Sequence, residues 1–291
     1  MKTILYKIIN KIGYRIERKR SRQELFPELN KYKITENFEL LFNAKTFVKS
    51  LDKTFDNFTL KTHKAGFLVS FLDYKIYVES VEEFLILNEV FVTKDYNFII
   101  NGKAVVIDIG ANIGISSLFF SRLDFVDAIY AFEPVLDTYN QAQYNFELNK
   151  SIHKVKQIKN IGLGENNRKE TFLFNKNNKG NTGVRGLLSP SYKNVIVEER
   201  QVQINEASSE IENIVRQSGT KKIVIKMDCE GAEYEILLSL KKELLDRIDI
   251  IILEWHDKGA KVLEDKLIAC GFNIFSTTLG PIAGLIMASK N

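Results

Sequence analysis

A short apolar run that ends in an acid and two glycines sets the strongest limit on how this chain can fold. Val105 to Ile109 are mostly β-branched or apolar, and Gly110 and Gly114 follow before a second apolar run that reads as a helix. An apolar run of this length bounded by glycine is typical of a buried parallel strand. The glycines would let the chain turn tightly and let a ligand approach the first N–H groups of the helix. The stretch therefore predicts the start of a βαβ unit.

A second predicted strand carries an acid where nucleotide-binding folds hold a ribose. Residues 128–132 are largely apolar and lead into Glu133 and Pro134. An acid at the tip of the second strand can accept hydrogen bonds from ribose hydroxyl groups. The strand, glycine turn, helix and second strand together indicate a nucleotide-type unit. The alternative is an α/β domain whose glycines serve only close packing.

The residues around the glycine turn favour S-adenosylmethionine over a dinucleotide. The middle glycine of the dinucleotide fingerprint lets the backbone approach a pyrophosphate, and here Asn112 takes its place. Asp108 at the strand tip would repel a pyrophosphate but would suit an ammonium group. S-adenosylmethionine carries a ribose, an ammonium and a sulfonium, and no phosphate. An NAD-linked oxidoreductase is the alternative that Asp108 and Asn112 argue against.

Length and composition fit a soluble globular protein with one large domain or one domain and a subdomain, because the chain has 291 residues and ordinary apolar content. Its two cysteines offer neither a disulfide framework nor zinc-finger spacing, so we expect a reducing, cytoplasmic setting. No apolar run approaches the length of a membrane span, and no signal peptide is evident.

Charge is concentrated at the N-terminus. Residues 1–22 hold eight Lys or Arg residues and one acid, so within a net charge of +4 the remainder carries −3. A body with this charge is not expected to bind nucleic acid. Residues 3–16 predict a basic amphipathic helix, which can attach peripherally to an anionic membrane surface. The favoured alternative is packing on the domain or a second subunit, because Gly13 and the short length weaken an anchor.

Two regions follow from the order of the predicted elements. Residues 1–100 combine the basic helix with an α+β cap that has no recognisable chemistry of its own, and residues 101–291 form the main domain. That domain alternates strands and helices, which predicts a doubly covered α/β sheet. It finishes on a strand pair, as a methyltransferase sheet does and a dehydrogenase sheet does not. Its seven predicted strands are residues 105–109, 128–132, 155–158, 222–227, 248–253, 272–276 and 282–288.

An insertion is predicted between the third and fourth of these strands. Two further strands, at residues 171–174 and within 195–204, flank a loop rich in Asn, Gly and Ser. A loop of this length inside a compact domain is usually functional or disordered. Thr182 and Arg185 are its candidate ligand contacts, and an ordinary solvated loop is the alternative.

Polar residues gather at the ends of the predicted strands, where ligands bind in open α/β sheets. Methyl transfer from a sulfonium needs the acceptor held in line, and a base if the acceptor is a hydroxyl. Asp228, Glu230 and His256 are the candidate catalytic residues, and His256 has the ordinary pKa nearest neutrality. One alternative is that the acids support a helix N-terminus. Another is that these three residues bind Mg²⁺ or Mn²⁺, although no fixed ligand spacing supports a metal assignment.

At these residues the chain resembles the FkbM-type methyltransferases. The resemblance runs from about Phe84 to the C-terminus, and its motifs occur in the expected order at residues 106–114, 131–134, 145–149 and 226–233. It implies a class I, Rossmann-like fold that uses S-adenosylmethionine. It also implies O-methylation of a hydroxyl, often on a sugar or a polyketide-like natural product. By this resemblance residues 228–233 would lie beside the acceptor.

We therefore expect a cytoplasmic S-adenosylmethionine-dependent O-methyltransferase, possible membrane contact through residues 1–22, and a saccharide or related small-molecule acceptor. The oligomeric state stays open. A non-catalytic recruiting module that keeps the fold is the alternative from another class. The predicted cofactor contacts, some carried by the resemblance and others by their place at strand ends, are Asp108, Gly110, Ala111, Asn112, Gly114, Glu133, Asn160, Ile161 and Asp228.

Overall fold

The structure, a computed structural model, describes residues 22–176, 179, 182–183 and 197–290. The predicted amphipathic helix at residues 3–16 and the candidate contact Arg185 lie outside these residues. Within them, no helix combines the length and the apolar character needed to cross a membrane.

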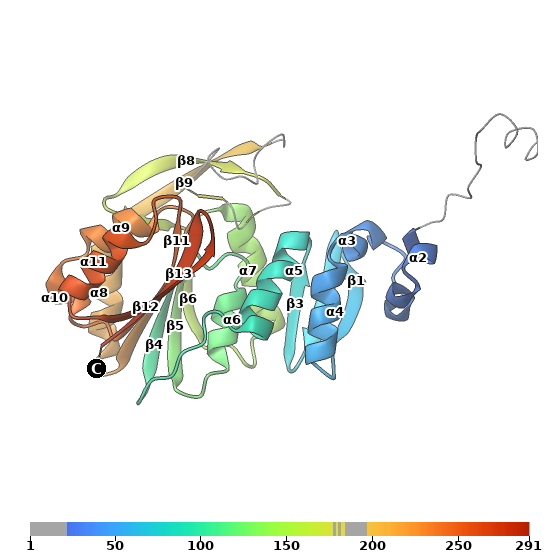
Figure 1. Ribbon diagram of the computed structural model, residues 1–291, viewed down its shortest axis with the longest axis horizontal. Coiled ribbons are helices and arrows are strands. Elements are labelled where there is room, and N and C mark those ends of the chain that lie inside the picture. Colours follow the sequence, from blue (N-terminus) through green and yellow to red (C-terminus); the bar gives the residue numbers. More distant parts are fainter. Residues whose placement is uncertain (1–21, 177–178, 180–181, 184–196, 291) are drawn as a thin grey trace, which may run out of the picture.

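A mixed sheet of seven strands forms the centre of the molecule, in the order β12-β13-β11-β10-β4-β5-β6 (Figure 1). Strands β4, β5, β6, β10 and β11 are parallel, and β13 is antiparallel to both β11 and β12. The predicted seven-stranded sheet with a terminal strand pair is therefore confirmed. The strands are β4 (Ala104–Ile109), β5 (Val126–Phe132), β6 (Val155–Lys159), β10 (Lys222–Met227), β11 (Ile250–His256), β12 (Asn273–Gly280) and β13 (Ala283–Ser289).

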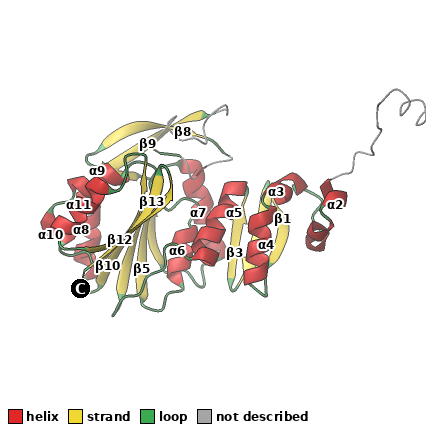
Figure 2. Ribbon diagram, viewed as in Figure 1, coloured by secondary structure: helices red, strands yellow, loops and turns green. Residues whose placement is uncertain are grey.

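Helices cover both faces of this sheet, as predicted (Figure 2). Successive strand residues point to opposite faces, so Val106 packs with α6 and α7 while its neighbour Ile107 packs with α8, α9 and α11. Because both faces are buried, the central strands are apolar along almost their whole length. Residues 233–245 form two helices, because Leu240 has extended backbone and a buried side chain. The helices are α6 (Ile115–Ser121), α7 (Leu136–Leu148), α8 (Ala207–Ser218), α9 (Glu233–Ser239), α10 (Lys242–Leu245) and α11 (Lys261–Ala269).

The insertion is a small separate sheet of order β7-β9-β8. Its strands β8 (Arg168–Phe174) and β9 (Glu198–Glu206) are the two predicted from the sequence. The third, β7 (Gly162–Gly164), was not expected, because a Gly-Leu-Gly segment carries no strand pattern. Its parallel pairing with β9 creates the strand. This sheet lies across the end of the main sheet at which the parallel strands finish.

The N-terminal region is an α+β cap, as predicted, and it shares its core with the main sheet. Buried Phe67, Phe84 and Phe91 of the cap belong to the same hydrophobic cluster as Leu118 of α6. The domain boundary near residue 100 stays a prediction. The cap contains α2 (Arg22–Leu25), the 3-10 helix η1 (Pro27–Tyr32), α3 (Phe38–Asn43), α4 (Lys45–Thr54), β1 (Thr59–His63), β2 (Gly66–Phe71), β3 (Tyr74–Val78), α5 (Val81–Asn88) and the π-helix η2 (Glu89–Thr93).

Three side-chain amides on α7 hold the free edge of strand β3, and we call them the amide column: Gln141, Asn145 and Asn149. Their spacing of four places them on one face of the helix. Asn145 Oδ1 accepts from the Tyr77 N–H (2.8 Å) and its Nδ2 donates to the Ile113 carbonyl (2.9 Å). Asn149 accepts from the Lys75 N–H (3.0 Å) and donates to the Lys75 carbonyl (2.7 Å). Gln141 donates to the Tyr77 carbonyl (3.1 Å). The column therefore pairs β3 as a neighbouring strand would.

Replacing Asn145 by Ala should destabilise the protein by about 2 to 4 kcal/mol, because the buried Tyr77 N–H and Ile113 carbonyl would both lose their partner. Urea unfolding measures this difference. The control is Gln143→Ala on the same helix, where the side chain is exposed and the expected change is under about 0.5 kcal/mol. Equal stabilities of the two variants would contradict the proposed role of the column.

Candidate active site

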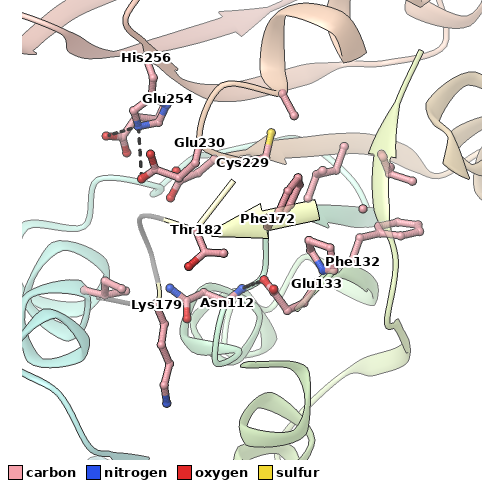
Figure 3. Close-up of a pocket in the computed structure, with 18 of the residues that line it drawn as sticks. Asn112, Phe132, Glu133, Phe172, Lys179, Thr182, Cys229, Glu230, Glu254 and His256 are labelled. Carbon is pink, nitrogen blue, oxygen red and sulfur yellow. Dashed lines mark hydrogen bonds and ion pairs between the residues drawn. The ribbon is translucent and has the colours of Figure 1, made fainter. Parts of the chain in front are cut away.

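A cavity of about 360 Å³ lies at the carboxyl ends of β4, β5, β10 and β11 (Figure 3). The strand order reverses between β4 and β10, which is where open α/β sheets form their ligand crevice. The cap and the small sheet complete the walls. The cavity wall includes residues of the cap, the main sheet and the small sheet: Leu85, Ile86, Glu89, Gly110, Asn112, Phe132, Glu133, Leu163, Phe172, Thr182, Ile204, Asp228, Glu230, Glu254, His256 and Ile282.

Glu133, at the end of β5, is a buried carboxylate in the cavity wall. Its Oε2 accepts from the Asn112 N–H (3.0 Å) and its Oε1 from the Val135 N–H (2.9 Å). Burial raises the pKa of Glu133 to about 7, against these two hydrogen bonds, which lower it. Figure 3 shows Glu133 and Asn112 side by side in the cavity. The structure thus places the predicted ribose acid beside the glycine turn.

Two glycines shape the turn between β4 and α6. Gly110 lines the cavity with φ +76°, and a Cβ there would lie 1.9 Å from the Asp228 carbonyl oxygen. Gly114 has φ +86°, and its Cβ would lie 2.7 Å from the Phe146 ring. Gly114 is not in the cavity wall, so its requirement comes from packing against α7. Only Gly110 of the pair is placed to approach a ligand.

Asp108 is directed away from the cavity, contrary to the prediction that it would meet an ammonium group. Its carboxylate is fully buried and accepts from the hydroxyls of Ser116 (2.7 Å) and Ser117 (2.6 Å) on α6. Its other oxygen lies 3.4 Å from Lys226 Nζ. Asp108 therefore supports the floor of the site and does not line it.

Three more predicted cofactor contacts lie behind the wall. Ala111 is buried, and Ile161 packs against the core on the α8 side of the sheet. Asn160 donates to the carbonyls of Glu133 (3.0 Å) and Pro134 (2.9 Å) and so holds the turn that presents Glu133. Neither Ala111, Asn160 nor Ile161 is in the cavity wall. Ala111 was predicted from the glycine motif, and Asn160 and Ile161 from their place at the end of the third strand.

Lys226 is a charged residue that the sequence analysis did not single out. It lies on β10 directly opposite Asp108 and is 2% exposed. Nζ donates to the Gly110 carbonyl (2.7 Å) and lies 3.8 Å from Asp228 Oδ2. Burial lowers the pKa of Lys226, but Asp108 and Asp228 outweigh it and raise the pKa above its usual value. The sequence signal that could have identified Lys226 is the presence of a lysine between apolar residues of a predicted strand.

The far end of the cavity is strongly acidic, and we call Glu89, Asp228, Glu230 and Glu254 with His256 the acidic end. Tyr96 of the cap donates its hydroxyl to Asp228 Oδ2 (2.8 Å). Burial, together with Glu254 and Asp228, raises the pKa of Glu89 to about 8. Burial and Asp228 also raise the pKa of Glu254. Glu89 was missed because the π-helix that carries it leaves no mark in helical spacing.

His256 is held by three carboxylates. Glu233 Oε1 lies 3.1 Å from Nδ1, while Glu254 and Glu230 lie 3.6 and 3.8 Å from Nε2. Burial lowers the pKa of His256, but the hydrogen bond to Glu233 and the nearby carboxylates of Glu254 and Glu230 raise it to about 11. The imidazole is then protonated at neutral pH. Protonation at neutral pH does not suit the role of a base, for which His256 was a candidate because the ordinary pKa of histidine lies nearest neutrality.

The part of the chain that forms this cavity matches a known protein family over most of its length. The family described as the Methyltransferase FkbM domain matches residues 108–274. The chain belongs to the FkbM methyltransferase family. The resemblance inferred from the sequence motifs is thereby confirmed, and the family is one of methyl-transferring enzymes.

Relatives of this FkbM methyltransferase occur in fungi and bacteria. Methyltransferase sdnD of Sordaria araneosa is 26% identical over 228 residues, covering 68% of this chain and 85% of that protein. AMB antimetabolite synthetase AmbE of Pseudomonas aeruginosa is 25% identical over 226 residues, which are 65% of this chain but only 10% of AmbE. The crystal structure of Methyltransferase FkbM from Methylobacillus flagellatus has 11% identity and a TM-score of 0.46, covering 99% of this chain and 70% of that one.

Glu133 should make the stability of this FkbM methyltransferase pH-dependent. Its folded pKa of about 7 lies above the ordinary value of 4.5, so ionisation disfavours the folded state. Relative to Glu133→Gln, the wild type should lose up to about 3 kcal/mol as the pH rises from 4.5 to above 7. Urea unfolding at pH 5 and pH 8 tests this. Glu147→Gln, at an exposed site on α7, is the control, and a pH-independent difference for Glu133→Gln would refute the prediction.

Proposed function

We propose that this protein uses S-adenosylmethionine to O-methylate a hydroxyl group of a saccharide or related small molecule. The observation that carries the proposal is one cavity with two unlike ends. Glu133 and the glycine turn form one end, and the acidic end lies opposite. The sequence-based cofactor assignment and the family membership support the same function.

The first end has the residues that an adenosyl group requires. Glu133 would accept hydrogen bonds from the ribose hydroxyls, and apolar Phe172 and Ile204 would pack against adenine. The backbone of Gly110 and Asn112 forms part of the cavity wall, and a side chain at residue 110 would clash with the Asp228 carbonyl oxygen. When bound, S-adenosylmethionine supplies an electrophilic methyl group on a positively charged sulfur. Carboxylates around the cavity suit such a cation and oppose the pyrophosphate of NAD.

The acidic end supports a small neutral acceptor. A hydroxyl loses its proton as it is methylated, so a nearby base assists the reaction. Glu89 lines the cavity, and with a pKa of about 8 its carboxylate is a stronger base than an exposed glutamate. Leu85, Ile86 and Ile282 offer apolar contact to the acceptor. Repulsion by the carboxylates would disfavour phosphate-rich acceptors such as nucleic acid.

Calorimetric titration with S-adenosylmethionine, S-adenosylhomocysteine and NAD tests the cofactor. The two adenosyl ligands should bind and NAD should not. Glu133→Ala should weaken their binding by about 10- to 100-fold, since charged hydrogen bonds are worth about 1.5 to 3 kcal/mol. Glu147→Ala is the matched surface control. Binding of NAD alone would favour an oxidoreductase, and binding of none of the three would favour the non-catalytic module.

Glu89→Gln should lower kcat of methyl transfer by about 100- to 10,000-fold, the usual contribution of a general base. Affinity for S-adenosylmethionine should be unchanged. The wild-type rate should rise as the pH increases through about 8, because Glu89 must lose its proton to act, and the variant should lack this rise. The assay follows radiolabelled methyl transfer to an acceptor found by screening hydroxylated saccharides. A variant rate within a factor of about three of wild type would exclude Glu89 as the base.

A further inference from the structure

Asp228, Glu254 and His256 bring three ligand-type atoms together at the acidic end. One oxygen of each carboxylate and one imidazole nitrogen all lie within 4.8 Å of one another. Met227 on β10 pairs with Leu253 on β11, so the residues that follow, Asp228 and Glu254, lie side by side. Glu254 and His256 are two residues apart on one strand and point to the same face. The backbone of two adjacent parallel strands therefore fixes the set.

The imidazole of His256 is oriented independently of those two acids. Its residue is 3% exposed, and Nδ1 is held at 3.1 Å by Glu233, whose side chain is fully buried. Nε2 lies 3.6 Å from Glu254 and 3.8 Å from Glu230, longer than a hydrogen bond. Among the described residues Nε2 has no hydrogen-bond partner, and Figure 3 shows the Glu254 and Glu230 carboxylates directed toward it. Metal-binding histidines are typically held by a carboxylate at the other ring nitrogen in this way.

Asp228 also has an oxygen to offer. Both the Tyr96 hydroxyl (2.8 Å) and Lys226 Nζ (3.8 Å) engage Oδ2, which leaves Oδ1 for another partner. Lys226 is itself compensated by Asp108 at 3.4 Å. The carboxylates of the acidic end therefore outnumber the cations beside them.

We propose that Asp228, Glu254 and His256 bind one divalent cation, Mg²⁺ or Mn²⁺, at the acidic end of the cavity. The two carboxylate oxygens are ligands that Mg²⁺ and Mn²⁺ prefer, and the imidazole nitrogen is a donor that the transition metal Mn²⁺ accepts more readily than Mg²⁺. Ligand atoms about 2.1 Å from an ion are at most about 4.2 Å apart, so a small side-chain rotation closes the observed spacing. The ion takes the place of the proton on Nε2. The binding itself is independent of the proposed function.

A role for the ion rests on the proposed function. Three protein ligands leave coordination positions for water and for an acceptor oxygen. A bound divalent ion lowers the pKa of a coordinated hydroxyl and orients it. The ion would then hold the acceptor while Glu89 receives its proton. The acceptors that fit best are vicinal diols, because two neighbouring oxygens can chelate one ion.

Titration of the EDTA-treated, dialysed full chain with Mn²⁺, followed by the electron paramagnetic resonance of the free ion, tests the site without any cofactor or acceptor. One Mn²⁺ should bind per chain. Asp228→Asn, Glu254→Gln and His256→Asn should each weaken binding at least about tenfold, and Glu233→Gln should weaken it about 10- to 100-fold by releasing Nδ1. His153→Asn is the matched control, because His153 precedes β6 at the opposite edge of the sheet.

Thermal unfolding and S-adenosylmethionine titration in EDTA show whether each variant is folded, so that a lost site is separated from a lost fold. No saturable Mn²⁺ binding at millimolar concentration would overturn the proposal, and so would binding that all three ligand variants leave unchanged. Absence of Mn²⁺ binding in a protein that still binds S-adenosylmethionine would reject the cation site alone. Mn²⁺ binding by a protein that binds neither S-adenosylmethionine nor S-adenosylhomocysteine would reject the proposed function and keep the cation site.

Discussion

The buried ion pair between Lys226 and Asp108 joins the two strands on which the whole site is built. These residues are register partners on β10 and β4, and Lys226 also holds the Gly110 carbonyl. The pair lies under the crevice where the strand order reverses. It therefore fixes the position of the glycine turn relative to the segment that begins at Asp228. Removing either partner would leave an uncompensated buried charge, which proteins tolerate poorly. Substitution of Lys226 or Asp108 alone should therefore destabilise the folded protein.

Above this floor, the cavity separates two kinds of carboxylate. Glu133 accepts two backbone hydrogen bonds and belongs to the turn that follows β5. The acidic end gathers its carboxylates from the cap, from β11 and from the segment after β10, and His256 and Lys226 are cations beside them. Burial and the like charges beside them raise the pKa values of Glu89 and Glu254, and that of Glu89 reaches about 8. A cationic ligand would relieve the same crowding of charge.

Patterns along the sequence predicted the elements better than the direction of single side chains. The order of apolar runs and turns located all seven core strands, and the acid after the second strand identified Glu133 as a residue of the site. The role predicted for Asp108 was wrong, because the direction of its side chain depends on the hydroxyls of Ser116 and Ser117. No sequence motif links these two serines to Asp108. The pKa of His256 depends on Glu233, twenty-three residues away. The local spacing of residues does not reveal long-range contacts of this kind, and it does not reveal the π-helix that carries Glu89.

The amide column has a consequence for how such proteins can be recombined. Strand β3 has β2 on one edge and side chains of the main domain on the other. A chimera that exchanged the cap of one relative for that of another, and kept its own α7, would pair backbone groups with whatever residues that helix carries at positions 141, 145 and 149. Asn145 also donates to the Ile113 carbonyl in the glycine turn, so the same graft would disturb the end of the cavity that Glu133 and this turn form. The cap and α7 therefore form one structural unit. They should be exchanged together when a new acceptor pocket is designed.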